Sequence, residues 1–249
     1  VTEIASSRPI TLVNSINQLM ERLHDRLNRE REFLADAAHE LKTPLAVLQV
    51  NADSIFDAKS ADRAQAARER LHEGVKRIAH TVHQLLAMAR SEADAHNAQR
   101  DRYDLTALAV DRMALMVPLA IQRGIEIELE APKPCWLNLH RESAAALIDN
   151  LIDNAIKYAR PKGRVLVRID GQPGTARLEV NDDGPGIAPH LRTKVFERFY
   201  RIPGQDLSGS GLGLSIVLSA VQRHHASIEL TDGLLGTGLG VRVQFQCPS

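Results

Sequence analysis

A histidine stands in the run Phe33-Leu-Ala-Asp-Ala-Ala-His-Glu-Leu-Lys-Thr-Pro44. His39 follows Ala38, a member of an apolar set spaced alternately by 4 and 3 residues, so helix geometry turns the imidazole about 100° away from the apolar face. Glu40 can accept or orient a ring proton, which makes the free nitrogen a better nucleophile. Thr43 lies one turn further along the same face. The spacing favours a reactive His39, with a solvated surface histidine as the alternative.

Four polar side chains share one face of a helix predicted over residues 142–159. Asn150, Asn154, Lys157 and Tyr158 stand at positions i, i+4, i+7 and i+8, where an apolar face would be expected. Amide oxygens suit Mg²⁺, an ammonium group suits phosphate oxygens, and a phenol ring can stack on a base. A helix with a polar outer face is the alternative.

A second polar cluster, Asn181-Asp-Asp-Gly-Pro-Gly-Ile187, follows a predicted strand. Gly184 and Gly186 let the backbone approach a planar ligand, and Asp182 can accept a hydrogen bond from an exocyclic amine. An ordinary turn explains the same residues.

A glycine loop over residues 209–213 leads into an apolar helix, whose N-terminal amides and dipole suit a phosphate group. It is no dinucleotide fingerprint, because no apolar strand precedes it, and the chain has no Walker A pattern. The segment 195–206 between the two clusters suits a mobile lid, or equally a surface loop anchored by its aromatic residues. The later run Gly236-Thr-Gly-Leu-Gly240 is by itself a weak signal that a hairpin turn also explains.

Helices with heptad-like seams must position His39. The apolar residues of the first seam repeat at spacings of 4 and 3: Leu34, Ala38, Leu41, Leu45, Leu48, Ala52 and Ile55. The second seam repeats in the same way: Leu71, Val75, Ile78, Val82 and Leu85. A turn near residues 57–61 makes the pair an antiparallel hairpin, and Pro44 should bend the first helix. A lone hairpin cannot cover both seams, so the pattern predicts a homodimeric four-helix bundle.

The chain changes character after residues 91–102, which have no apolar period and indicate a linker. Asp104 should cap a helix over 105–122 that Gly124 ends and Pro118 bends. Strands are predicted over 125–130, 136–139, 165–170, 176–181, 227–231 and 241–246, and further helices over 142–159 and 212–224. This order predicts an α/β sandwich, a mixed sheet with helices on one face.

Composition excludes several classes of protein. The 249 residues are 44% hydrophobic and 25% charged with a formal net charge of +0, which gives nucleic-acid binding no electrostatic support. Cys135 and Cys247 fit neither a disulfide framework nor a zinc site, and indicate a reducing compartment. No apolar run approaches the roughly 20 residues of a membrane span. Because the sequence begins at Val1, inside a predicted helix, we expect that an upstream segment has been removed.

Taken together, these motifs resemble the cytoplasmic part of a bacterial two-component sensor histidine kinase. The matching runs are HELKTP as the H box, NLIDNAIKY as the N box, DDGPG as G1, FERFYR as the F box, GSGLGLSIV as G2 and GTG as G3. The likeness extends from about Phe33 to the C-terminus. Residues 1–29 resemble, more weakly, the last helix of a HAMP signal-relay module.

The resemblance implies a role for each matching residue. His39 would be the phospho-acceptor and Glu40 its acid/base partner, and Thr43 would position water for dephosphorylation. Asn154, aided by Asn150, would hold Mg²⁺. The implied ATP-binding residues are Asn150, Asn154, Lys157, Tyr158, Asp182, Gly184, Gly186, Arg201, Gly209, Gly211, Leu212 and Gly213.

The resemblance also implies the organisation and partners. The expected parts are a HAMP-like helix (1–29), a dimerisation and phospho-acceptor hairpin (30–92), a linker (93–103) and a catalytic ATP-binding domain (104–249). The expected partners are a second copy of the chain and a response regulator receiver domain, with no nucleic acid. This part would be cytoplasmic, in a protein of the bacterial inner membrane held there by the removed upstream segments. The rival functions are a gyrase- or chaperone-type ATPase and a non-catalytic dimeric relay scaffold.

Overall fold

The computed structural model describes residues 7–56, 60–93, 100–172, 174–204 and 210–246, apart from some side chains of the first two helices and that of Leu235. Contacts divide the chain into two compact units, Val1–Ala79 and His80–Ser249. The last turns of the second helix thus belong to the second unit. The domain boundaries expected from the resemblance stay a prediction.

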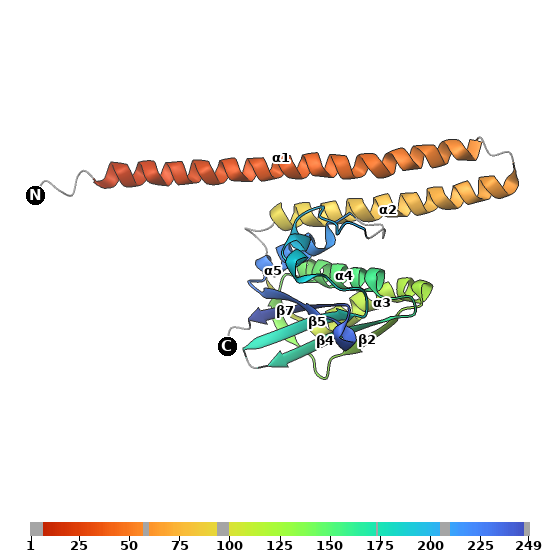
Figure 1. Cartoon of the computed structure of the whole chain (residues 1–249). Helices are drawn as coiled ribbons and strands as arrows, with labels where there is room; N and C mark the ends of the chain where they lie inside the picture. The colour runs from red at the N-terminus through yellow and green to blue at the C-terminus, as the bar shows by residue number, and fades with distance from the viewer. Residues whose placement is uncertain (1–6, 57–59, 94–99, 173, 205–209, 247–249) are drawn as a thin grey trace, which may run out of the picture. The chain divides into compact units, whose positions relative to one another are not determined.

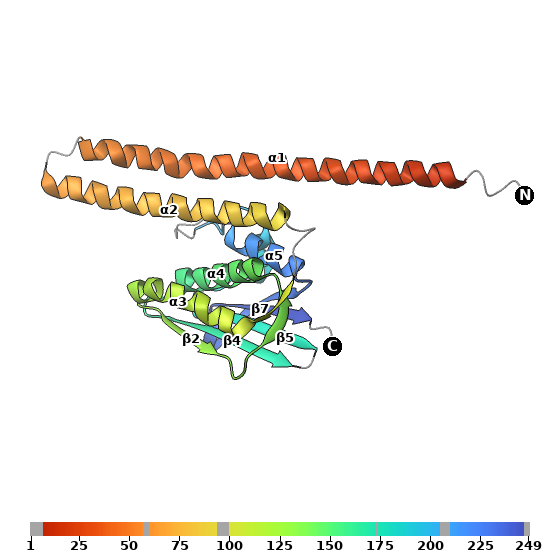
Figure 2. The same cartoon turned by 180° about the vertical axis from the view of Figure 1, so that it is seen from behind.

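Two long helices dominate the first unit. Helix α1 spans Ser7–Phe56, and the first part of α2 (Ala61–Ala93) runs beside it in the opposite direction (Figures 1 and 2). The predicted hairpin is therefore confirmed, although its turn at 57–59 lies outside the described residues. Helix α1 continues through Pro44 as one element. The bend expected there stays a prediction.

The hairpin covers its apolar seams only in part. Leu41, Leu48 and Ile78 are half-buried, whereas Leu34 and Val75 remain exposed. Further large apolar side chains of α1 are also exposed in the single chain: Ile16, Leu19, Met20, Leu23 and Leu27. Exposed apolar surface at heptad spacing is what a second helix pair would cover.

The second unit begins with a strand and a capped helix. Asp104 ends β1 (Asp101–Asp104) and caps α3 (Leu105–Arg123), because its carboxylate accepts hydrogen bonds from the backbone N–H of Thr106 at 3.0 Å and of Cys135 at 2.9 Å. Gly124 ends α3 with a φ of 67°. Both predicted caps are confirmed. The sequence pattern predicts no strand at β1, which pairs with β3 (Trp136–Leu139) in a short antiparallel ribbon.

A five-stranded sheet in the order β2-β4-β5-β7-β6 forms the body of this unit. Its strands are β2 (Glu126–Glu130), β4 (Arg164–Gln172), β5 (Thr175–Asp182), β6 (Ser227–Asp232) and β7 (Leu239–Gln246). The β2–β4 pair is parallel and the other pairs are antiparallel. The predicted mixed sheet is confirmed.

Helices α3, α4 (Arg141–Tyr158) and α5 (Gly213–Arg223) cover one face of the sheet (Figures 1 and 2). Alternate residues of the central strands, such as Val167, Leu178 and Val243, are fully buried beneath them. The opposite face carries exposed ion pairs, including Arg168–Glu130 and Arg242–Glu229. Solvent screens such pairs, so the core on the helical side is the main source of stability.

Helix α3 is long and apolar enough to pass a test for a membrane span by length and composition, which sequence analysis did not anticipate. Its buried residues Leu105, Leu108 and Met113 belong to the core beneath the sheet. Val110, Leu115 and Ile121 on the same helix are exposed, and 28% of the tested window is buried, so packing against the sheet accounts for only part of the apolar composition of α3.

A buried histidine joins the ends of α4 and α5. His224 receives the backbone N–H of His140 at Nε2 (3.1 Å), so Nδ1 carries the proton and donates to the carbonyl of Ala220 (2.8 Å). Burial lowers the pKa of His224, against the raising effect of the Ala220 carbonyl, and the charges of Arg100 and His140 lower it further. The neutral imidazole is thus built into the contact between the two helices.

This contact predicts a loss of stability on acidification. Because the pKa of His224 is lower in the folded chain than its ordinary 6.5, the unfolded chain takes up the proton first, and stability falls as the pH drops below about 6.5 by up to about 1.4 kcal/mol per pH unit. Replacing His224 by Gln should remove that part of the pH dependence. Denaturant unfolding at pH 7.5 and 5.5 measures it, with the exposed His190→Gln as the matched control. Parallel pH dependences in both variants would contradict the prediction.

Candidate nucleotide-binding and phospho-acceptor sites

The histidine of the H box is open to chemistry. His39 is exposed on α1, as are Ala38 and Thr43. The structure therefore places the imidazole in solvent, with the Thr43 side chain one turn away on the same helix face. The side chain of Glu40 lies outside the described residues. Its pairing with His39 stays a prediction.

Two asparagines of α4 lie against the glycine loop that precedes α5. A Cβ built on Gly213 would be 3.0 Å from Nδ2 of Asn154 and 3.4 Å from Oδ1 of Asn150, so this backbone and both amides share one small space. Asn150 donates Nδ2 to the carbonyl of Ala146 at 2.8 Å. That bond fixes its amide orientation and directs Oδ1 toward the glycine loop.

These donors fit a magnesium ion. Amide oxygens are hard ligands, and Mg²⁺ ordinarily keeps several waters and takes its remaining oxygens from one or two protein groups and from phosphate. Among the described residues no group of three or more His, Cys, Asp or Glu side chains could hold a metal. As two amide groups, Asn150 and Asn154 suit a cation that brings phosphate oxygens with it.

A positively charged group lies at the C-terminal end of α4. The ammonium of Lys157 is 4.9 Å from the ring centroid of Tyr158. Burial lowers the pKa of Lys157; Asp153 opposes this, while the charges of Arg201 and Arg123 lower it further. Burial also raises the pKa of Tyr158, and Arg201 opposes that rise. Arg201 is thus close in space to Lys157 and Tyr158, although more than forty residues separate them in sequence, and a phosphate group would offset the positive charge of Lys157 and Arg201.

Asp182 is held at the end of β5 by two backbone donors. Its Oδ1 accepts hydrogen bonds from the N–H groups of Gly184 (2.8 Å) and Leu239 (3.0 Å), and the side chain is only 3% exposed. Burial raises the pKa of this carboxyl group, while the two hydrogen bonds lower it. Because both bonds end on Oδ1, Oδ2 is the carboxylate oxygen available to a ligand.

The glycines of the G1 and G3 boxes pack against Asp182 and one another. A Cβ on Gly184 would lie 2.3 Å from the carbonyl oxygen of Tyr158, and one on Gly186 (φ +71°) 2.5 Å from that of Gly238. A Cβ on Gly238 (φ +77°) would lie 2.1 Å from the carbonyl oxygen of Asp182. Only glycine fits these contacts, so the sequence pattern reflects backbone proximity as well as turn geometry.

The G3 box contains its own matched control for this proximity. Gly236 has a φ of +74°, close to that of Gly238, but a Cβ there would meet nothing within 4 Å. We expect Gly236→Ala to lower the free energy of unfolding by about 1 kcal/mol, the strain of a left-handed alanine, and Gly238→Ala by more than about 3 kcal/mol because of the added clash. Denaturant unfolding compares the two, and equal losses would show that the contact with Asp182 is unimportant.

The glycine loop contacts the F box through Gly211 and Phe199. The N–H of Phe199 donates to the carbonyl of Gly211 at 3.1 Å, and a Cβ on Gly211 (φ +71°) would lie 2.6 Å from the Phe199 carbonyl carbon. Phe199 itself has a φ of 61°, which is uncommon and costly for a bulky residue. The junction joins Phe199, which lies within the predicted lid segment 195–206, to Gly211 of the glycine loop. Residues 205 and 206 of that segment lie outside the described residues.

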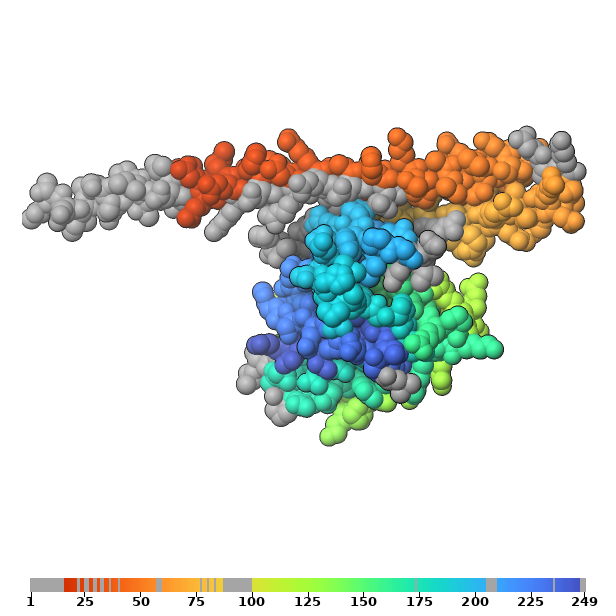
Figure 3. All heavy atoms as spheres, viewed as in Figure 1, coloured from red at the N-terminus to blue at the C-terminus, as the bar shows by residue number. Residues whose placement is uncertain are grey.

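The structure describes Leu212 of the G2 box but not Gly209. Leu212 is fully buried; its N–H donates to the hydroxyl of Ser210, and its carbonyl accepts the hydroxyl of Ser215. Gly209 lies outside the described residues. The segment following β5, which leads to this loop, forms part of the surface of the second unit (cyan in Figure 3).

Comparisons with known proteins identify the family of the chain. Residues 29–94 match the family described as "His Kinase A (phospho-acceptor) domain", and residues 140–249 match "Histidine kinase-, DNA gyrase B-, and HSP90-like ATPase". The solved mycobacterial sensor histidine kinase MprB is 31% identical with a TM-score of 0.52, over 60% of this chain and 99% of that one. The chain belongs to the bacterial sensor histidine kinases.

Curated relatives of this histidine kinase support the same family. The swarming motility regulation sensor protein RssA of Serratia marcescens is 32% identical over 94% of this chain and 50% of its own length. The sensor protein kinase PmrB of Pseudomonas aeruginosa is 35% identical over 93% of this chain and 49% of its own length. The chain thus spans about half the length of the curated relatives it matches.

Several residues near the site of this kinase were not found by sequence reasoning. Asp183 accepts the backbone N–H groups of Arg160 and Arg164, both at 3.1 Å, and so holds the turn after α4. Arg192 donates to the carbonyl groups of Ile187 and Leu230, which ties the G1 loop to β6. These contacts join segments distant in sequence, and no local pattern announces them.

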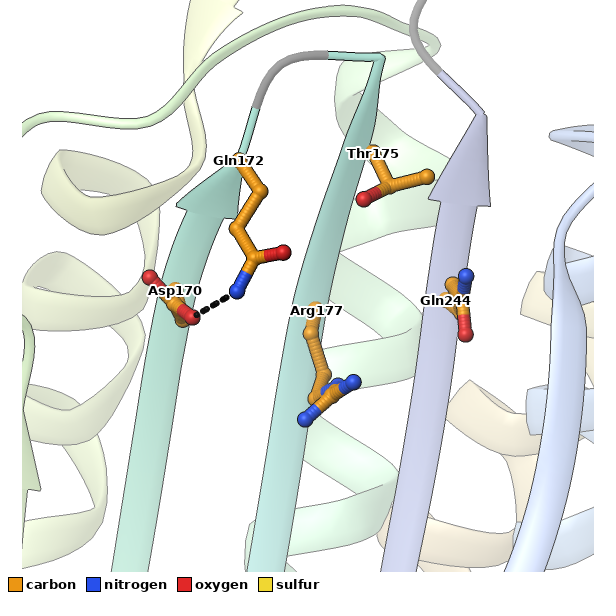
Figure 4. Close-up of a pocket in the computed structure, with 5 residues that line it drawn as sticks. All are labelled: Asp170, Gln172, Thr175, Arg177 and Gln244. Carbon is orange, nitrogen blue, oxygen red and sulfur yellow. Dashed lines mark hydrogen bonds between the residues drawn. The ribbon is translucent and has the colours of Figure 1, made fainter.

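A shallow pocket lies apart from all these residues. It is lined by Asp170, Gln172, Thr175, Arg177 and Gln244, at one end of β4, β5 and β7 (Figure 4). The Gln172 amide donates to Asp170 at 3.2 Å within it. None of the predicted site residues of the kinase lines this pocket, so it has no part in the nucleotide site.

Proposed function

We propose that this chain is an ATP-dependent histidine autokinase that phosphorylates His39 and passes the phosphoryl group to an aspartate of a response regulator. The observation that carries the proposal is the joint packing of Asn150 and Asn154 against Gly213, in the same unit as Asp182 in its glycine cradle. The family supports the same reading. The exposed imidazole of His39 supplies the acceptor.

Each residue of the nucleotide site has a proposed task. Asp182 accepts the adenine amine through Oδ2, and Tyr158 packs beside the base. Lys157 and Arg201 contact phosphate oxygens, because their two positive charges lie close enough for the charge of Arg201 to lower the pKa of Lys157. The backbone of the G1 and G2 glycines approaches the nucleotide closely.

Asn154, aided by Asn150, would hold Mg²⁺ together with the phosphates. When bound, the ion neutralises charge on the transferring phosphoryl group. The contribution of the protein is to position these groups, since phosphoryl transfer needs little covalent chemistry from the enzyme.

In the transfer step a ring nitrogen of His39 attacks the γ-phosphorus of ATP. A phosphorus–nitrogen bond forms, the bond from phosphorus to the bridging oxygen breaks, and ADP leaves with the electron pair. Glu40 takes up the ring proton. Thr43 would position water when the regulator or His39 is dephosphorylated, which makes a phosphatase activity part of the proposal.

The exposed seams of the hairpin favour a homodimer as the working form, because a second copy would cover Leu34 and Val75. We further propose that this part of the protein faces the bacterial cytoplasm, where ATP and receiver domains are found. An upstream segment of a longer protein would attach it to the inner membrane.

Incubation with γ-labelled ATP and Mg²⁺ tests the function. We expect label on the protein that is acid-labile and base-stable, as a phosphoimidazole is, and that moves to a receiver domain. Hydrolysis of ATP without labelled protein would instead favour an ATPase of the gyrase or chaperone type. Failure of both reactions would favour a relay scaffold.

A further inference from the structure

The side-chain amide of Gln84, in the last part of α2, connects two predicted elements of the nucleotide site. Its Nε2 donates to Oδ1 of Asn150 at 3.2 Å, and its Oε1 accepts the hydroxyl of Ser210 at 2.6 Å. Ser210 in turn accepts the backbone N–H of Leu212 at 3.2 Å. All of these residues belong to the second unit. We call the contacts of Gln84 with Asn150 and Ser210 the Gln84 bridge.

The bridge is buried and its polar groups are paired. Gln84 and Asn150 are each 9% exposed. Asn150 uses Nδ2 for the carbonyl of Ala146, so its Oδ1 is the atom left for another partner. In this structure that partner is the N–H of Gln84. A buried amide with both ends satisfied is stable against water, so displacing it costs free energy.

The same oxygen is the one proposed to aid a magnesium ion. A cation must approach an amide oxygen along the directions that hydrogen-bond donors use, and Mg²⁺ brings waters and phosphate oxygens with it. The amide of Gln84 is a donor placed at that oxygen, and it lies beside Ser210 of the G2 box. The Gln84 bridge and bound Mg²⁺–ATP therefore compete for the space around Oδ1 of Asn150 and for the lone pairs of that oxygen.

We propose that the Gln84 bridge is an autoinhibitory contact that holds the nucleotide site closed to Mg²⁺–ATP. Release of Gln84 frees Oδ1 of Asn150 and the hydroxyl of Ser210. The apparent affinity for nucleotide is then the intrinsic affinity reduced by the fraction of chains in which the bridge is open. Since α2 also carries part of the hairpin seam, a change in that helix has a direct route to the site. The inference rests on the proposed function, because it takes Asn150 as part of the nucleotide site.

Calorimetric titration of the full 249-residue chain with the non-hydrolysable ATP analogue AMPPNP tests the bridge. Gln84→Ala removes the amide, and Gln84→Met keeps much of its volume without the donor. We expect both variants to bind the analogue about fivefold more tightly in Mg²⁺. With EDTA in place of Mg²⁺ the gain should largely disappear, because the bridge competes with the cation at Asn150.

Gln65→Ala is the matched control, since Gln65 lies on the same helix and pairs with Glu69 on the exposed surface. It should leave the affinity unchanged. Unchanged or weaker binding in both Gln84 variants overturns the inference, and an equal gain with and without Mg²⁺ overturns competition at the cation.

An Asn154→Ala variant distinguishes failure of the inhibitory bridge from failure of the proposed nucleotide site. If it weakens AMPPNP binding while the Gln84 variants do not change it, only the inhibitory bridge fails. If Asn154→Ala has no effect on binding, the proposed nucleotide site fails and the bridge fails with it.

Discussion

Replacement of His39 by glutamine should abolish labelling of the protein by γ-labelled ATP and leave ATP binding intact. Glutamine keeps the polarity and approximate size of the side chain but has no nucleophilic ring nitrogen, so the phosphorus–nitrogen bond cannot form. Loss of the attacking group in covalent catalysts costs orders of magnitude, and we expect a fall of at least about 10³-fold. Nucleotide affinity should persist, because the proposed binding residues lie within 150–213, in the second contact unit.

Autoradiography and titration calorimetry on the same preparations measure the two quantities. His24→Gln is the matched control, since His24 is another exposed histidine of α1. It should be labelled as the parent chain is. Label retained in His39→Gln would place the acceptor elsewhere. Loss of nucleotide binding in that variant would contradict the separation of acceptor and nucleotide sites.

The sequence predicted this fold well where periodicity is strong. The two helices of the hairpin, the caps at Asp104 and Gly124, and the alternation in β5 all depend on local geometry, and all three are observed. Strand β1 was missed, because Asp-Arg-Tyr-Asp has no apolar alternation and pairs only with the short strand β3. Its pairing depends on a partner more than thirty residues away, which no local pattern encodes.

In the candidate site, too, local spacing was predicted from the sequence and contacts between distant residues were not. The spacing of Asn150 and Asn154 on one helix face predicted that they act together, and the structure brings both to Gly213. The role of glycine was predicted only as freedom of the backbone. The structure adds the reason for Gly238, whose missing side chain leaves room for the Asp182 backbone. Gln84 could not be predicted, because 66 residues separate it from Asn150 and a glutamine on a polar helix has no signature of its own.

The second large effect concerns ATP binding and depends on how the carboxylate of Asp182 is hydrogen-bonded. We expect Asp182→Asn to weaken ATP binding by about 10- to 100-fold, or about 1.5–3 kcal/mol. Oδ1 accepts the N–H groups of Gly184 and Leu239, so asparagine must keep its carbonyl oxygen there. Its NH₂ group then replaces Oδ2 and faces the adenine amine, a donor against a donor. The fold should be little affected, because both backbone bonds survive and no charge is buried.

The pH dependence of binding gives the same variant a second readout. Burial raises the pKa of Asp182 above the ordinary 3.8, so the carboxylate takes up a proton at a higher pH than an exposed one. A protonated Oδ2 becomes a donor, and ATP affinity should weaken as the pH falls toward that raised pKa. Protonation relieves the buried charge, so the same acidification should raise the contribution of Asp182 to stability down to its unfolded pKa.

Calorimetric titration with ATP across pH 4.5–8, together with thermal unfolding, separates binding from folding. Asp170→Asn is the matched control, because it makes the same chemical change at an exposed carboxylate in the shallow pocket of Figure 4. It should keep both the affinity and the pH dependence of the parent. Asp182→Asn should bind weakly, with the pH dependence of that group removed and a nearly unchanged Tm. If it instead binds ATP as tightly as the parent, Oδ2 does not accept the adenine amine, and the orientation proposed for the base is wrong.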